Sequence, residues 1–267
     1  MDRPTWVPEE IDFARPSASR VYDFYLGGSH NFAVDRDLGR QAIRVVPELP
    51  RIMQANRAFL RRAVEFLVDA GVRQFLDIGS GIPTAGNVHE VAQVRAPECR
   101  VVYVDIDPVA VAHSQAILDG DDRTAVVQAD LREPVAVLGD PELRRLLDLD
   151  RPVALLLFAV LHFVPDDQDP GGLVGRYRDA LAPGSWLALS HGTDEGAPEE
   201  ITRALHALYR RTPTPAVTRS RDQVAGLFAG FDVVEPGVVA LPDWRPEPDD
   251  DRRPVWSAAY GGVGRKP

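Results

Sequence analysis

Short apolar runs recur along the chain, and most of them end in acidic residues or glycines. The run 74–78 leads into Gly79-Ser80-Gly81, and the run 100–104 ends at Asp105. Apolar runs of this length are typical of parallel strands that are buried on both faces of a sheet. Similar runs predict further strands at 124–130, 153–162, 186–190, 231–235 and 255–260.

Helical periodicity separates the predicted strands. The clearest helix covers 51–70, where an apolar stripe repeats at helical spacing and Gly71 is placed to end it. Asn56 and Arg57 precede the stripe, and we expect them to face solvent. Further helices are expected near 35–46, 87–94, 108–116, 173–181 and 198–210.

This alternation of strands and helices predicts an α/β fold, with a Rossmann-like, doubly wound and mostly parallel sheet covered by helices on both faces. Residues 1–70 precede the first strand and predict an N-terminal arm and a helical cap, whereas residues 71–267 predict the core. Within the cap, Gly27-Gly28 ends a short helix. That helix either docks through its aromatic residues or folds over a ligand as a lid.

Composition narrows the functional classes. The 267 residues are 45% hydrophobic and carry a formal net charge of −10, which argues against an electrostatic grip on nucleic-acid phosphates. Cys99 is the only cysteine, so an intrachain disulfide and a cysteine-based metal site are excluded. The acidic loop 166–169 is flanked by prolines and by Gly171-Gly172, which predicts a solvated turn and no metal.

No sequence feature indicates targeting or membrane insertion. No basic-then-apolar leader opens the chain, and no apolar run reaches membrane-spanning length. We therefore expect a cytoplasmic protein, a monomer or homodimer, with neither a membrane nor a nucleic acid as partner.

Acids and glycines at the ends of the first three predicted strands indicate a ligand site. Glycine tolerates positive φ and has no Cβ, so a ligand can lie directly on the backbone of Gly79-Ser80-Gly81. Asp77 precedes this turn, Asp105 stands where an acid commonly binds a ribose hydroxyl, and Asp130 ends the third strand. Open parallel sheets bind ligands at the carboxyl ends of their strands, so these residues predict a nucleoside-bearing cofactor.

Two cofactor classes compete for this site. A dinucleotide binder commonly has a third glycine, but Thr84 occupies that position, and the only lysine, Lys266, lies too near the C-terminus for a Tyr-x-x-x-Lys motif. S-adenosylmethionine (SAM) has no pyrophosphate. Its ammonium, ribose and adenine amine suit Asp77, Asp105 and Asp130 respectively. SAM is therefore favoured, and an NAD-dependent oxidoreductase remains the more remote alternative.

The same motifs resemble those of a known family. Asp77-Ile78-Gly79-Ser80-Gly81, 104–108 and 128–130 are similar to class I SAM-dependent methyltransferase signatures, although 82–84 depart from them. The stretches 20–28, 31–33 and 87–93 resemble an actinobacterial S-adenosyl methyltransferase family of mostly unassigned substrates.

The resemblance covers about 15–267 and implies a seven-stranded sheet with an antiparallel last strand. It also implies the cofactor-binding residues: Gly79 and Gly81 at the methionine moiety, Asp105 at the ribose, Asp130 and Leu131 at the adenine, Tyr22 on a lid, and Asp77, Ser80 and Ile106 beside them.

Methyl transfer is an in-line displacement, to which a protein contributes mainly by positioning the reactants and excluding water. An acceptor that loses a proton also needs a base. His162 and His191 end predicted neighbouring strands and are the candidate catalytic residues, and His30 is a weaker one. We expect a methyltransferase that acts on a small molecule and releases S-adenosylhomocysteine. A catalytically silent SAM-binding sensor or interaction protein is the alternative.

Overall fold

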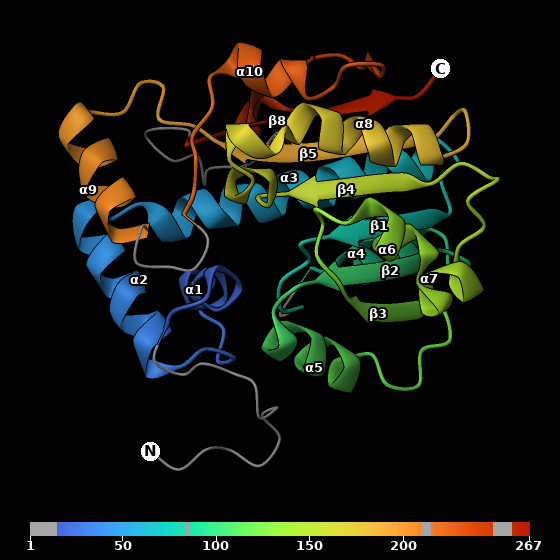
Figure 1. The fold of residues 1–267 in the computed structure, drawn as a ribbon, viewed down its shortest axis with the longest axis horizontal. Coiled ribbons are helices and arrows are strands. Elements are labelled where there is room, and N and C mark those ends of the chain that lie inside the picture. Colours follow the sequence, from blue (N-terminus) through green and yellow to red (C-terminus); the bar gives the residue numbers. More distant parts are fainter. Residues whose placement is uncertain (1–14, 84–85, 210–214, 248–257) are drawn as a thin grey trace.

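The computed structural model of the protein describes residues 15–83, 86–209, 215–247 and 258–267, and within them a single sheet runs through the middle of the molecule (Figure 1). Its order is β3-β2-β1-β4-β5-β8-β6, with β7 paired to β8. β1 to β5 are parallel, and β8 is antiparallel to β5. The strands are β1 Gln74–Ile78, β2 Arg100–Asp105, β3 Thr124–Gln128, β4 Ala154–Phe158, β5 Trp186–Gly192, β6 Asp232–Val233, β7 Val239–Ala240 and β8 Ala259–Arg265.

This topology confirms the predicted Rossmann-like, doubly wound sheet. The chain runs outward from β1 through β2 to β3 and then returns to place β4 on the other side of β1. Such a reversal leaves a crevice at the carboxyl ends of the central strands, where open α/β sheets bind ligands. The described residues form eight strands against the expected seven because the two-residue β7 adds one beside β8.

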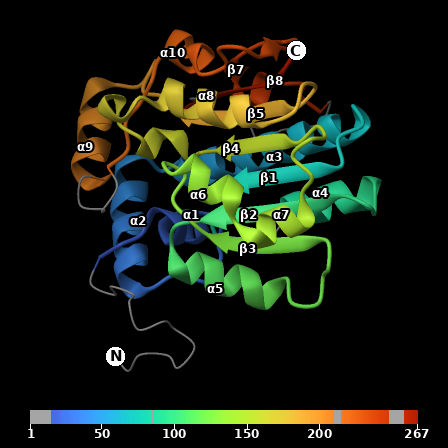
Figure 2. The ribbon, with the colours of Figure 1, turned by 45° about the vertical axis from the view of Figure 1, so that its right-hand side comes forward.

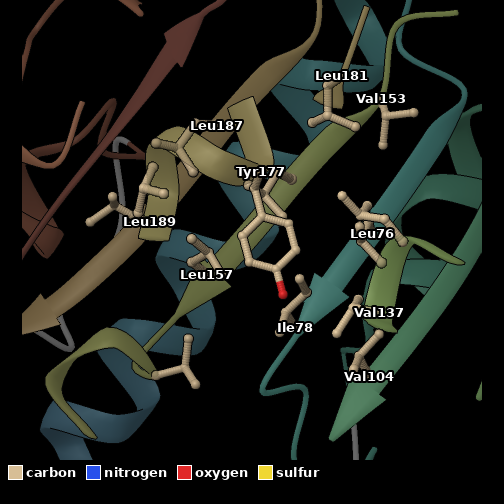
Figure 3. Close-up of a cluster of buried hydrophobic side chains, with 14 of the residues drawn as sticks. Leu76, Ile78, Val104, Val137, Val153, Leu157, Tyr177, Leu181, Leu187 and Leu189 are labelled. Atoms are coloured by element: carbon tan, nitrogen blue, oxygen red, sulfur yellow. The ribbon is translucent and has the colours of Figure 1, made fainter. Parts of the chain in front are cut away.

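Helices cover both faces of the sheet through two apolar clusters. One face packs against α6, α7, α8 and α10, and Figure 3 shows Tyr177 of α8 among sheet side chains such as Leu76 and Leu157. The other face packs against α3 and α4. The helices are α1 Ala18–Tyr25, α2 Ala33–Val45, α3 Leu49–Asp69, α4 Val88–Arg95, α5 Pro108–Ile117, α6 Pro134–Gly139, α7 Pro141–Leu146, α8 Pro170–Ala180, α9 Glu199–Tyr209 and α10 Arg221–Gly226, with 3-10 turns at Leu161–Phe163, Asp166–Gln168 and Leu241–Asp243.

A third apolar cluster joins α1, α2 and α9. These helices gather at the end of the sheet toward which the β4 arrowhead points, as Figures 1 and 2 show from two directions. α3 takes part in two clusters, because Leu49 and Ile52 pack with the cap helices whereas Phe59 and Val64 pack on the sheet. The predicted boundary at residue 70 therefore stays a prediction. No helix of the described residues is both long enough and apolar enough to cross a membrane.

The strand predicted over 153–162 is shorter than expected. β4 ends at Phe158, and Ala159 has a φ of 51°, which turns the chain into the 3-10 turn that carries His162. The apolar run continues past the strand because Leu161 and Val164 are buried in the core beneath this turn. The apolar residues after Phe158 therefore indicated burial and not a longer strand. No glycine or proline at 159–163 marks the turn in the sequence.

The last strand also differs from its prediction. β8 covers Ala259–Arg265, whereas the sequence pattern placed it at 255–260, of which 255–257 lie outside the described residues. The part of β8 beyond the predicted strand contains glycines at 261, 262 and 264. A Cβ on Gly261 would lie 2.7 Å from side-chain atoms of both Leu241 and Phe59, so glycine is required there by close packing within a strand.

The helix predicted over 173–181 begins earlier, at Pro170, and includes Gly171-Gly172. Both glycines lie in the first turn of α8, and the carboxylate of Asp169 caps this helix by accepting a hydrogen bond from the Gly172 N–H at 3.0 Å. The predicted arm over 1–14 lies outside the described residues.

Candidate functional site

A cavity of about 610 Å³ lies at the carboxyl ends of the central strands, beneath α1 and α9. One part is lined by the turns that follow β1, β2 and β3, and the other part by the ends of β4 and β5 and by the cap. Its volume is in the range of small-molecule sites. The cavity is not lined by His30, the weaker catalytic candidate, but it brings together the other site residues predicted from the sequence: Tyr22, Asp77, Gly79, Ser80, Gly81, Asp105, Ile106, Asp130, Leu131, His162 and His191.

The glycine turn after β1 depends on both of its glycines. Gly79 and Gly81 have φ values of 73° and 65°, a region that favours glycine. A Cβ on Gly79 would lie 2.2 Å from the side chain of Val160, whereas one on Gly81 would meet no atom within 4 Å. The Gly81 N–H donates a 2.7 Å hydrogen bond to the carboxylate of Asp105, which fixes the turn against the end of β2.

Two buried carboxyl groups stand behind this turn. Burial raises the pKa of Asp77 to about 7, with Arg57 opposing the shift and Asp105 adding to it. Burial also raises the pKa of Asp105 to about 6, although backbone N–H donors from Asp107 and Gly81 lower it. Both groups therefore titrate near neutral pH, which makes ligand binding by their charged forms sensitive to pH.

Arg57 and Asn56 lie inside the site, and the prediction that they face solvent is wrong. Asn56 is only 6% exposed, and both residues line the cavity. Asn56 continues the buried stripe of α3 backward, since Ile52, Asn56 and Phe59 follow one another at spacings of four and three. This spacing was the available signal, and the polar identity of Asn56 concealed it.

Asn56 is the centre of a hydrogen-bonded chain that links the cap to the sheet. Its side-chain N–H donates to the Tyr22 hydroxyl at 2.9 Å, and that hydroxyl donates to the Met53 carbonyl at 3.3 Å. Its side-chain oxygen accepts from the Ser190 hydroxyl at 2.6 Å, and Ser190 Oγ accepts from the Ala159 N–H at 3.0 Å. The position of Tyr22 on α1 is thereby tied to the ends of β4 and β5.

The turn after β2 contributes an apolar side chain to the cavity wall, and the turn after β3 contributes an acidic one. Ile106 is 53% exposed, which is unusual for a large apolar side chain, and it lines the cavity. Asp130 is held by Arg132, whose Nε lies 2.9 Å from both carboxylate oxygens. Burial alone would raise the pKa of Asp130, but hydrogen bonds from Arg132 outweigh it and the pKa is lowered. Leu131 lies between Asp130 and Arg132 in the sequence, and its carbonyl accepts a hydrogen bond from the Tyr177 hydroxyl.

His191 and His162 lie near each other but differ in their hydrogen bonds. Their rings are 5.7 Å apart. His191 is fully buried, and its Nε2 faces the Arg219 guanidinium at 2.7 Å while Nδ1 faces the Gly192 carbonyl at 2.8 Å. Because arginine can only donate, Nε2 accepts and Nδ1 carries the proton. Burial lowers the pKa of His191 to about 4, so the ring is neutral at physiological pH. Both of its nitrogens have hydrogen-bond partners.

His162 has a buried nitrogen without a partner. Its Nδ1 has no hydrogen-bond partner within the part of the chain that the structure describes, and the ring lines the cavity. Burial, with His191 and Arg219 adding to it, lowers the pKa of His162 to about 3. The ring is therefore neutral at physiological pH, and its Nδ1 keeps the capacity to accept a hydrogen bond.

Arg219 fixes the turn that carries His162, and no motif in the sequence indicates this role. It is 4% exposed and donates to the carbonyls of Leu161 at 3.2 Å and Val164 at 2.9 Å. It also pairs with Asp166, so one residue of the predicted solvated loop serves to close this turn.

The cap is tied to the turn after β2 by a buried ionic cluster. Arg20 Nε lies 2.9 Å from Asp35, and Arg20 Nη1 lies 3.4 Å from Asp107. The Ser17 hydroxyl donates to the same Asp107 carboxylate, whose other oxygen caps α5 by accepting from the Val109 N–H at 2.8 Å. Arg20 and Asp35 are 4% and 0% exposed, so a buried ion pair helps to hold the cap in place.

The described residues contain no group of three or more His, Cys, Asp or Glu side chains that could hold a metal ion. The chain does match a known family: the model described as "S-adenosyl methyltransferase" covers residues 4–267. No curated protein matches the chain in sequence.

Solved structures of similar proteins share the whole fold. A DUF574 family protein from Streptomyces avermitilis MA-4680 is 43% identical, with a TM-score of 0.90 over 96% of this chain and 99% of its own. A candidate methyltransferase from Thermobifida fusca YX is 42% identical, with a TM-score of 0.91 over 98% of this chain and 99% of its own. The pyocyanin biosynthetic protein PhzM is 18% identical, with a TM-score of 0.51 over 83% of this chain and 59% of its own, and shares the fold alone.

Proposed function

The chain belongs to the S-adenosyl methyltransferase family, and from this premise we propose that it binds SAM in the cavity and transfers the methyl group to a small-molecule acceptor. One observation carries the proposal: acids at the ends of three adjacent strands, Asp77, Asp105 and Asp130, line a single cavity. Their order along the sheet edge matches the order of amino acid, ribose and adenine in SAM.

Each part of the cavity fits one part of this cofactor. Asp77 would hold the ammonium, and Arg57, whose Nε is buried without a hydrogen-bond partner among the described residues, would hold the carboxylate. The open backbone of Gly79-Ser80-Gly81 would follow the methionine chain, Asp105 the ribose and Asp130 the adenine amine. The exposed Ile106, with Leu131, would pack on the adenine ring, and Tyr22 of α1 would close the cavity.

SAM supplies a methyl group on a sulfonium, a good leaving group, so the protein has to orient the acceptor and exclude water. We assign the proton-accepting role to His162, because its Nδ1 has no partner in the described structure. His191 was the other candidate, but both of its nitrogens are engaged, so we assign it a positioning role beside His162. Residues 1–70 act in this account as a cap on the core formed by 71–267.

Titration calorimetry with SAM on the full chain tests the proposal. We expect micromolar binding by the wild type and at least about tenfold weaker binding by Asp105→Ala, since a charged hydrogen-bond acceptor for the ribose is lost. Asp122→Ala is the matched control, because that side chain is 96% exposed before β3. A folded wild-type protein that fails to bind millimolar SAM would overturn the proposal. Release of S-adenosylhomocysteine with acceptor mixtures then separates a methyltransferase from a silent SAM-binding protein.

A further inference from the structure

The part of the cavity farthest from β2 and β3 is walled by one face of α9. Thr202, Leu205, His206 and Tyr209 line the cavity and follow one another at helical spacing. The Tyr209 hydroxyl lies 2.8 Å from that of Tyr25 on α1, so the two cap helices meet over this space. α9 is separate in sequence from every segment assigned to the cofactor.

The opposite walls of this space are apolar. Leu49, Ile52 and Met53 come from the start of α3, Phe163 from the turn after β4, and Val217 from the segment before α10. The Val217 N–H donates to the His162 carbonyl at 2.7 Å, which holds that segment against the turn. An acceptor bound here would contact mainly hydrocarbon.

Polar groups without partners mark two points of the space. His162 Nδ1 and His206 Nε2 are both buried and have no hydrogen-bond partner among the described residues. Asp194 is the one carboxylate among the cavity-lining residues that the structure describes in β5, in α9 and in the loop between them. Buried nitrogens without partners, such as those of His162 and His206, are satisfied when a ligand brings its own donor or acceptor.

Taken with the proposed function, on which the inference rests, we infer that the acceptor is a neutral, mostly apolar compound with a hydroxyl group at His162 and a second oxygen at His206. A cationic acceptor would be repelled by the sulfonium in the same cavity. An anionic acceptor would have to leave water for walls that are largely apolar. A neutral hydroxy compound meets neither obstacle.

The unpaired His162 nitrogen also completes the proton balance of the reaction. As the acceptor oxygen bonds to the methyl carbon, the C–S electron pair stays on sulfur and the hydroxyl proton passes to His162 Nδ1 and then to water. The positive charge of the sulfonium disappears in the same step, which makes the imidazolium easier to form when it is needed.

Calorimetry on the full chain saturated with S-adenosylhomocysteine tests the charge and chemistry of the acceptor with three probes of one shape: naphthol, naphthoate and naphthylmethylammonium. We expect naphthol to bind at least about tenfold more tightly than either ion, because the ions lose hydration in the apolar space. Equal or tighter binding of an ion, or no binding of naphthol to the saturated protein, overturns the inference. Failure of S-adenosylhomocysteine itself to bind would instead overturn the proposed function.

Two pairs of measurements test the wall formed by α9 and the role of His162. Leu205→Lys should weaken naphthol binding at least about tenfold and leave S-adenosylhomocysteine affinity within about twofold, whereas Ala207→Lys, on the exposed face of α9, should change neither. Retained cofactor affinity shows that the variant is folded. His162→Gln should leave cofactor affinity unchanged and lower methyl transfer to naphthol by about a hundredfold. Naphthol affinity unaffected by Leu205→Lys, or wild-type transfer rates in His162→Gln, would contradict the assignment.

Discussion

At the scale of single residues, Asp77 shows how burial changes the ionisation of a group that we propose to bind the cofactor. Its carboxyl lies at the end of a fully buried strand, and burial raises its pKa to about 7. The raised pKa means that the folded protein without ligand holds this proton more tightly than the unfolded chain does. The stability contributed by this group is therefore present below about pH 4 and is lost as the pH rises through 7. An ammonium group bound to the carboxylate would reverse that loss.

The raised pKa predicts that SAM binding depends on pH. If the ammonium of SAM requires ionised Asp77, affinity should fall by about tenfold between pH 8 and pH 6 as the carboxyl takes up its proton. Binding at pH 6.5 should also release a proton, measurable by calorimetry in buffers of different ionisation enthalpy. Asp77→Asn should bind weakly and with a flat profile between pH 6.5 and 8. The same pH dependence in Asp77→Asn as in the wild type would exclude this carboxyl as its source.

At the scale of elements, the position of α1 depends on two buried polar connections and one apolar cluster. The ionic cluster around Arg20 ties it to the turn after β2, and the Asn56 chain ties it to the ends of β4 and β5. Buried polar groups are costly when they lose a partner, so each connection favours a single position of the helix. The cap is thus positioned over the cavity by groups that also stand beside the cofactor residues.

Arg20→Ala tests the ionic connection. The substitution leaves Asp35, which is 0% exposed, without its cation, and we expect the free energy of unfolding to fall by about 3–5 kcal/mol in urea denaturation. Arg40→Ala is the matched control, because that arginine pairs with Asp37 on the exposed face of α2 and such pairs contribute less than about 1 kcal/mol. Equal losses in the two variants would show that the buried cluster does not fix the cap.

How far the sequence predicted these elements depended on how local their determinants are. Helices and parallel strands followed from periodicity, and the glycine turn with Asp77 and Asp105 followed from motifs only a few residues long. Arg219 could not be predicted, because its partners lie 28 to 58 residues away and only the fold brings them together. The extent of β8 was mispredicted for the same reason, since Gly261 fits this strand through close contacts with Phe59 and Leu241, which are distant in sequence.

At the scale of the whole molecule, the cavity is formed where a strand-order reversal meets a helical cap. The sheet contributes the turns that face the proposed cofactor, and α1, α3 and α9 contribute the space for the proposed acceptor. Chain segments from residue 15 to residue 259 line this one space, so cofactor and acceptor would meet near His162 and the end of β4. The family's methyltransferase fold would thus be combined with a cap that selects the acceptor.

A crystal structure of the chain with S-adenosylhomocysteine tests this account most directly. We expect the amino-acid end of the ligand at Asp77 and Arg57, the ribose hydroxyls at Asp105, and the adenine between Ile106 and Leu131. Ligand density elsewhere in the molecule, or an adenine placed at the ends of β4 and β5, would contradict it.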